Sequence, residues 1–191
     1  MAVPTLNEIE LVAQAQSGDR NAFNELVRTH AHGVMNVIYR MCGDARIAED
    51  AAQETFIQAW LHLSSYRPQT SLRSWLYRIA VNAATDMLRK EKRILPNALE
   101  DLHLQDPQLG PEALFFQEER TALVKKAILS LPEASRVVLV LREYEEMSYH
   151  EIANILNIPI GTVMSRLNYA RKALKDKLEQ KLFIQVEAEH V

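Results

Sequence analysis

The chain has 191 residues, of which 48% are hydrophobic, and a formal net charge of −3. This length allows one large domain or two small ones, and the composition is that of an ordinary globular protein. No run of about 18 apolar residues occurs, which argues against a membrane-spanning helix, and the N-terminus lacks the basic start and apolar core of a secretory signal. The single cysteine, Cys42, excludes an internal disulfide and favours a reducing cytoplasm.

The charge is unevenly distributed along the chain. Residues 67–93 carry seven Lys/Arg against two Asp/Glu, and residues 160–181 carry six against two. The segment between them, residues 94–159, carries eleven acidic side chains against five basic ones. A polyanion would therefore be attracted to two separated places. This distribution favours a nucleic acid that is contacted at two points.

Three helices are predicted in the first third of the chain. Apolar residues recur at helical spacing in three segments, residues 6–16, 21–41 and 45–63. Turns that contain Gly18 and Gly43 separate these segments. Gly33 lies inside the second helix and weakens it, because glycine is a poor helix former.

One side of the third helix gathers Asp50, Gln53 and Glu54. Spacings of three and four residues place all three side chains on one helix face. A solvated surface is the ordinary interpretation of such a cluster. A docking surface for a basic partner helix is the functional interpretation.

Residues 66–93 combine aromatic and basic side chains. A loop at residues 66–68 precedes a helix for which Ser71 is the predicted cap. The flank opposite the apolar stripe carries a ring, an amide and several charges, namely Trp75, Arg78, Asn82, Asp86, Arg89 and Arg93. A ring can stack on an unpaired base, an amide can read its edge and cations can hold phosphates. The alternative is that Trp75 and Tyr77 are core residues, which is the more frequent role of aromatic residues on a helix.

A change of composition divides the chain in two. Residues 95–111 contain three prolines, one glycine and three acidic residues without helical periodicity, which is typical of a linker. We therefore predict an all-α fold of two small helical domains, residues 1–94 and 112–182, joined by a flexible linker. The second domain begins with a helix near Pro111, and an apolar, β-branched helix follows over residues 134–142. The acidic tail, residues 183–191, is expected to be frayed.

Residues 148–175 have the pattern of a helix-turn-helix. Ser148 and Glu151 have the spacing of a capping box, so a short helix should begin there, and Pro159 should end it. A second helix from Gly161 has an apolar stripe inside and a basic, polar face outside. A helix of this kind fits the major groove of DNA. The alternative is an ordinary helical hairpin with a solvated basic face.

No catalytic constellation is recognisable in the sequence. It contains no phosphate-binding glycine loop, no HExxH motif, no paired cysteines and no nucleophile elbow. We therefore expect neither an enzyme nor a bound metal or cofactor.

Three motifs, taken together and in this order, resemble a known family. They are AEDAAQETFIQAW, SLRSWLYRIAVNAATDMLRKEKR and LPEASRVVLVLREYEEMSYHEIANILNIPIGTVMSRLNYARKAL. The sequence is similar to the extracytoplasmic-function (group 4) sigma factors of bacterial RNA polymerase, within the sigma-70 family. The resemblance covers both predicted domains, which would be sigma region 2 and sigma region 4.

This resemblance implies three binding surfaces. The residues implied in docking to the largest subunit of core polymerase are Asp50, Gln53 and Glu54. The residues implied in opening the −10 element and capturing a flipped base are Leu63, Tyr66, Arg67, Trp75, Tyr77, Arg78, Ile79 and Asn82. The residues implied on the helix that reads the −35 element are Thr162, Met164, Ser165, Arg166, Asn168, Tyr169, Arg171 and Lys172. An anti-sigma factor is a further implied partner.

Two positions depart from the family pattern. Several relatives have arginine at the position of Met164 and a basic or aromatic residue at that of Asn168. Methionine cannot make the bidentate contact with guanine that arginine makes, so we expect a different −35 preference.

Two other functions are compatible with parts of the sequence. A transcriptional regulator that acts without polymerase would explain residues 148–175 but not the clusters around Glu54 and Asn82. An enzyme with a DNA-targeting domain has no candidate active site. The resemblance favours a cytoplasmic initiation factor that acts by binding alone.

Overall fold

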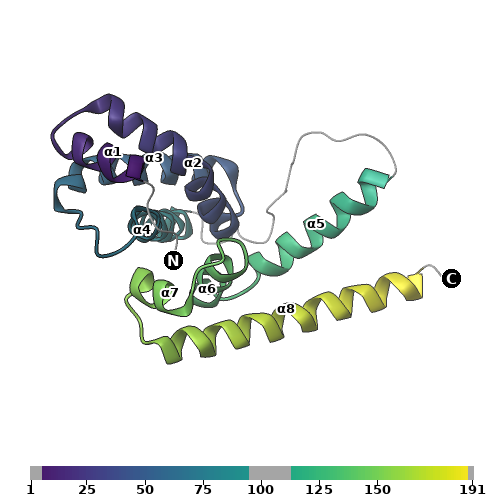
Figure 1. Ribbon diagram of the computed structural model, residues 1–191. Coiled ribbons are helices and arrows are strands. Elements are labelled where there is room, and N and C mark those ends of the chain that lie inside the picture. Colours follow the sequence, from purple (N-terminus) through teal and green to yellow (C-terminus); the bar gives the residue numbers. More distant parts are fainter. Residues whose placement is uncertain (1–5, 95–112, 189–191) are drawn as a thin grey trace.

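The computed structural model describes residues 6–94 and 113–188, and within these two ranges the regular structure is entirely helical (Figure 1). The all-α prediction is confirmed. The N-terminal unit contains α1 (Leu6–Gln16), α2 (Arg20–Cys42), α3 (Ala45–His62), the 3-10 helix η1 (Leu63–Ser65) and α4 (Leu72–Ile94). The C-terminal unit contains α5 (Ala113–Leu129), α6 (Glu133–Glu143), α7 (Tyr149–Leu156) and α8 (Ile160–Ala188).

Polar caps fix where several helices begin and end. The side chain of Asp19 accepts a hydrogen bond of 2.8 Å from the backbone N–H of Asn21, and that of Asp44 accepts one of 2.9 Å from Ile47. Gly43 ends α2 with a φ of 77°, a left-handed conformation that favours glycine. Helix α2 is continuous through Gly33, so the glycine does not break it.

The core of the N-terminal unit lies between α2, α3 and α4. Val34, Val37 and Ile38 from α2 are fully buried, as are Ala48 from α3 and Ala80 from α4. Their spacing of three and four residues aligns each set on one face of its helix. Alanines at the contact allow the helices to approach closely, and longer side chains fill the space beside them.

The C-terminal unit packs α6 and α7 against α8. Val138 and Val140 on α6 have no exposed surface, and neither do Ile152 on α7 and Val163 on α8. The β-branched run of α6 is intrinsically poor helix material, so burial on α8 outweighs propensity here. The predicted capping box is present, because Ser148 accepts from the N–H of Glu151 while the Glu151 carboxylate accepts from the N–H of Ser148.

The prediction of a frayed tail is wrong as far as residue 188. Helix α8 continues to Ala188, and the sequence after Gly161 contains no glycine or proline that would end it. The predicted linker, residues 95–111, and the predicted first turn at Pro111 lie outside the described residues.

The two units are in direct contact. Figure 1 shows α6 and α7 against the ends of α2 and α4, with α8 along the outer side, and the structure records contacts of α2 with α5 and α6 and of α4 with α7. The buried residues of both units form one continuous apolar cluster. None of the described helices is long and apolar enough to cross a membrane.

Candidate nucleic-acid and partner interfaces

The acidic cluster of α3 forms one exposed face, as its spacing predicts. Asp50 and Gln53 are exposed and Glu54 is half-buried. The Glu54 carboxylate accepts a hydrogen bond of 2.7 Å from the amide of Gln58 one turn later, which fixes its orientation. The face is therefore ordered and open to a partner.

Two large apolar side chains extend this face. Ile57 is 46% exposed and Leu61 is 62% exposed, although both belong to an otherwise well-packed helix. They follow Glu54 by three and seven residues, so they lie on the same face. The sequence analysis missed them, although their positions outside the buried stripe of α3 would have revealed them. We name Asp50, Gln53, Glu54, Ile57 and Leu61 the α3 face.

The predicted −10 residues do not all reach the surface. Arg67, Arg78 and Asn82 are exposed, whereas Trp75 and Ile79 are half-buried. Three others are buried, with exposed fractions of 2% for Leu63, 6% for Tyr66 and 2% for Tyr77. In this conformation those three side chains offer almost no surface to a DNA strand.

Tyr66 is held in place by its own loop. Its ring packs on Trp75 with 5.2 Å between centroids, and its hydroxyl donates a hydrogen bond of 2.7 Å to the carbonyl of Thr70. The amide of Gln16 donates to the carbonyls of Tyr66 (3.1 Å) and Leu63 (2.9 Å). These contacts close the segment between η1 and α4.

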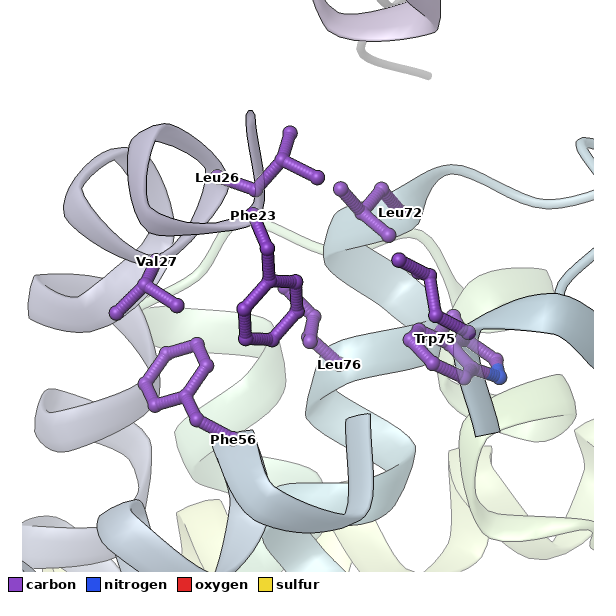
Figure 2. Close-up of a pocket in the computed structure, with 8 residues that line it drawn as sticks. Phe23, Leu26, Val27, Phe56, Leu72, Trp75 and Leu76 are labelled. Atoms are coloured by element: carbon purple, nitrogen blue, oxygen red, sulfur yellow. The ribbon is translucent and has the colours of Figure 1, made fainter. Parts of the chain in front are cut away.

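An apolar crevice lies beside Trp75 (Figure 2). It is lined by side chains from three α-helices and the 3-10 helix η1, namely Phe23, Leu26, Val27, Phe56, Leu63, Leu72, Trp75 and Leu76. Figure 2 shows the rings of Phe23, Phe56 and Trp75 gathered around it. Its free interior is about 10 Å³, which holds no more than one water molecule. A base cannot enter this crevice while the loop is closed.

Tyr77 contacts the other unit instead of solvent. Its hydroxyl donates to the carboxylate of Glu145, and Arg73 donates to the same carboxylate at 2.8 Å. Burial is the main cause that raises the pKa of Tyr77 to about 12, and the hydrogen bond to Glu145 adds to it. Tyr77 is thus a neutral hydrogen-bond donor between the units.

The first turns of α8 present the predicted −35 residues. Met164 is 48% exposed and Tyr169 is 54% exposed, both on the outer side of the helix. Two polar side chains are already engaged: the Ser165 hydroxyl donates to the carbonyl of Thr162 at 3.0 Å, and Arg171 donates to Glu143 at 2.7 and 3.0 Å. The outer face of α8 thus presents the thioether of Met164 and the phenol of Tyr169. A helix that reads DNA bases is expected to carry polar side chains at such positions.

Other side chains on α8 have no polar contact within the described part of the chain. Asn168 and Lys172 are exposed and Arg166 is half-buried, and none of them forms a hydrogen bond or ion pair there. Their polar groups are therefore available to DNA. Asn168 follows Met164 by one helical turn, so the two side chains lie side by side.

The fold and these surfaces define a two-part helical protein with an acidic and apolar exposed face on α3 in one unit and an exposed polar and basic face on α8 in the other. Comparison with known families agrees with this class. The family description "Sigma-70 region 2" matches residues 26–94, and "Sigma-70, region 4" matches residues 121–174. The chain belongs to the extracytoplasmic-function (ECF) RNA polymerase sigma factors of the sigma-70 family. Members of this family are transcription initiation factors, not enzymes.

Three relatives illustrate the similarity. The RNA polymerase sigma-H factor of Pseudomonas aeruginosa is 36% identical over 89% of this chain and 93% of its own length. The ECF sigma factor SigW of Bacillus subtilis is 34% identical over 87% of this chain and 94% of its own length. The ECF sigma-E factor of Escherichia coli K12 is 37% identical over 91% of this chain and 95% of its own length.

Solved structures show the same fold. CnrH in complex with the cytosolic domain of CnrY superposes with a TM-score of 0.69 at 27% identity, covering 91% of this chain and 98% of that one. The sigma factor RpoE of Bartonella quintana, solved with the anti-sigma factor NepR, has a TM-score of 0.67 at 24% identity. The match covers 82% of this chain and 96% of that one.

Proposed function

We propose that the chain binds core RNA polymerase through the α3 face, reads duplex −35 DNA with α8 and captures the melted −10 strand with α4, in the cytoplasm. The observation that supports this best is the α3 face itself. Exposed Ile57 and Leu61 beside Asp50 and Glu54 combine apolar area with charge, as the centre and rim of a protein interface do. A helix face that contacts only solvent is not expected to combine exposed apolar side chains with acidic ones.

Capture of a −10 base requires a movement of the loop that precedes α4. Asn82 and Arg78 are exposed on one flank of α4 and are ready to contact a strand. Tyr66 must leave Trp75 and break its hydrogen bond to Thr70 before a base can stack there. Stacking contributes about 1–3 kcal/mol per base, which is enough to replace one ring contact and one hydrogen bond.

We also propose a protein antagonist for this chain. CnrH, at 27% identity, was solved with a bound protein, the cytosolic domain of CnrY. The sigma-factor resemblance implies an anti-sigma factor in the same role.

Reconstituted transcription tests the proposed function. The purified chain is added to core polymerase with a library of genomic fragments, and transcripts are mapped to their start sites. We expect a defined set of start sites with shared upstream elements. Transcripts that are unchanged by addition of the chain would refute the proposal, and a sequence-specific footprint without polymerase would favour a simple helix-turn-helix regulator instead.

Met164 should make promoter reading sensitive to a thymine methyl group. An apolar side chain in the major groove contacts the C5-methyl of thymine, whereas an amide such as that of Asn168 pairs with adenine. Each thymine of the −35 element is replaced in turn by uracil, which lacks only this methyl group. One replacement should lower initiation about fourfold, the effect of about 0.8 kcal/mol for a buried methyl group.

The matched variants locate this effect at one side chain. Met164→Ala should lose the sensitivity to uracil, and Met164→Leu should keep it, since leucine is also apolar and of similar size. Equal initiation from thymine and uracil templates at every position would show that Met164 does not contact a thymine methyl.

A further inference from the structure

The glutamine at the end of α1 holds the loop that precedes α4. The amide of Gln16 donates hydrogen bonds of 2.9 Å to the carbonyl of Leu63 and of 3.1 Å to that of Tyr66, which are 47 and 50 positions away along the chain. Leu63 is the first residue of η1, and Tyr66 is the residue that ends it. One side chain of α1 therefore fixes both ends of the η1 turn.

The other end of the loop is fixed by a cap at the start of α4. The N–H of Ser74 donates to the hydroxyl of Ser71 at 3.2 Å, and the N–H of Trp75 donates to the carbonyl of Ser71 at 3.1 Å. Between η1 and this cap, residues 67–70 are all exposed. The loop thus has two anchored ends, and residues 67–70 are the part that can move without disturbing η1 or α4.

Arg67 forms a second clamp on the same turn. Its guanidinium donates to the carbonyls of Ser64 at 2.8 Å and of Tyr66 at 3.1 Å. The carbonyl of Tyr66 therefore accepts from two side chains, Arg67 and Gln16. The carbonyl of Leu63 likewise accepts from the backbone N–H of Tyr66 at 3.0 Å. Because both carbonyls keep a donor without Gln16, the glutamine is not required to complete the hydrogen bonding of the turn.

The two clamps differ in how a nucleic acid would affect them. Arg67 is exposed, and it is one of the residues that the family resemblance implies in −10 binding. A guanidinium forms stronger, charge-assisted hydrogen bonds with a phosphate than with a neutral carbonyl, so an approaching strand would draw Arg67 off the turn. The amide of Gln16 is neutral, and a phosphate does not attract it in the same way. Gln16 is then the side chain that still holds the carbonyl of Tyr66.

We propose that Gln16 is a positioning residue for capture of the −10 strand, a role that rests on the proposed function. Gln16 keeps the backbone of Tyr66 in place while Arg67 moves to the strand. The ring of Tyr66 can then leave Trp75 by rotation of its side chain and movement of residues 67–70, and η1 stays intact. Without Gln16, the backbone of Tyr66 would move with the loop, and the place for a base beside Trp75 would lose its fixed edge.

Promoter templates with a missing base test the positioning role. The full chain is combined with core polymerase, and each base of the melted −10 strand is replaced in turn by an abasic site. In the parent chain, one such replacement should lower the amount of open complex about tenfold, because the stacking of that base is lost. Gln16→Met, which keeps the length of the side chain but has no donor, should form about fivefold less open complex on the intact template. The same abasic site should lower it only about twofold further, since the base is already poorly held.

Gln14→Met is the matched control for this variant. Gln14 is exposed on the same helix, and its side chain forms no hydrogen bond within the described part of the chain. The control should keep the full sensitivity of the parent chain to the missing base. A general folding defect lowers the amount of open complex on intact and abasic templates by the same factor, so it leaves this sensitivity unchanged. A sensitivity in Gln16→Met equal to that of the parent would therefore overturn the positioning role.

The fluorescence of Trp75 tests the two clamps without polymerase or DNA. Trp60→Phe leaves Trp75 as the single tryptophan of the chain, and quenching by acrylamide reports how often the ring of Tyr66 leaves it. Gln16→Met and Arg67→Gln each keep one clamp, so each alone should leave the quenching constant close to that of the parent. Their combination should raise it at least about twofold, because each lost hydrogen bond shifts the opening equilibrium about fivefold.

The two experiments separate the possible failures. Equal quenching in the combined variant and in the parent would overturn the clamp, and with it the positioning role. Absence of an open complex with the parent chain on every template would instead refute the proposed function. The positioning role would fall with it, while the quenching would still decide whether Gln16 holds the loop.

Discussion

Glu54→Lys should abolish the association of the chain with core polymerase. Glu54 lies at the centre of the α3 face, between Asp50 and the apolar pair Ile57 and Leu61. The substitution replaces an attraction to a basic partner by a repulsion, and like charges across an interface cost several kcal/mol. We expect the Kd to rise on the order of 100-fold. The loss of binding is measured from the amount of labelled chain that co-elutes with core polymerase in size-exclusion chromatography.

The same helix supplies a matched control. Glu49 is exposed and lies about 140° around α3 from Glu54, at the edge of the α3 face beside Gln53. Glu49→Lys makes the same change of charge at this edge, so it should weaken core binding clearly less than Glu54→Lys does. Normal co-elution of Glu54→Lys, or equal losses in both variants, would remove the α3 face from the interface.

Asn82→Ala should reduce the formation of open promoter complexes while core binding stays intact. Asn82 is exposed on α4 and has no polar contact within the described chain, so its loss should not affect folding. Loss of the hydrogen bonds from its amide to an unstacked base removes about 1–2 kcal/mol, which is on the order of tenfold in open complex. Permanganate, which oxidises unpaired thymines, reports melting at the −10 element directly.

Asn24→Ala serves as the control for this variant. Asn24 is exposed on α2, a different helix from that of Asn82, and undergoes the same chemical change. It should melt the promoter as the parent does. If Asn82→Ala gives the same permanganate pattern as the parent, Asn82 has no part in strand capture.

The sequence predicted local structure well because the signals for it are local. Ser148 and Glu151 predicted a capping box, and both of its hydrogen bonds are present. Gly43 predicted the end of α2, and it adopts the left-handed conformation that such an end requires. The α3 face was predicted in its polar part, since Asp50, Gln53 and Glu54 need only helical spacing to come together.

Contacts between segments that are far apart along the chain could not be predicted from the sequence alone. The family resemblance assigned Tyr77 to the helix implied in opening the −10 element, but its hydrogen-bond partner in the structure, Glu145, is 68 positions away along the chain. Tyr66 was assigned to a pocket for a base. In the structure its ring packs on Trp75 and its hydroxyl bonds to Thr70, and these contacts depend on the shape of a turn that hydrophobic periodicity cannot predict. The extension of α8 to Ala188 was missed because the acidic composition suggested fraying although no helix-breaking residue is present.

The position of Gly33 in the middle of α2 reverses an ordinary rule of protein engineering. Replacing an internal helical glycine by alanine usually stabilises a protein by up to about 1 kcal/mol. A methyl group at Gly33, however, would collide with the phenol oxygen of Tyr77. A thermostability screen that selects Gly33→Ala for its helix propensity would displace this phenol and leave the carboxylate opposite it with one donor fewer. The helical weakness at this site is thus what gives the tyrosine room to reach its neighbour.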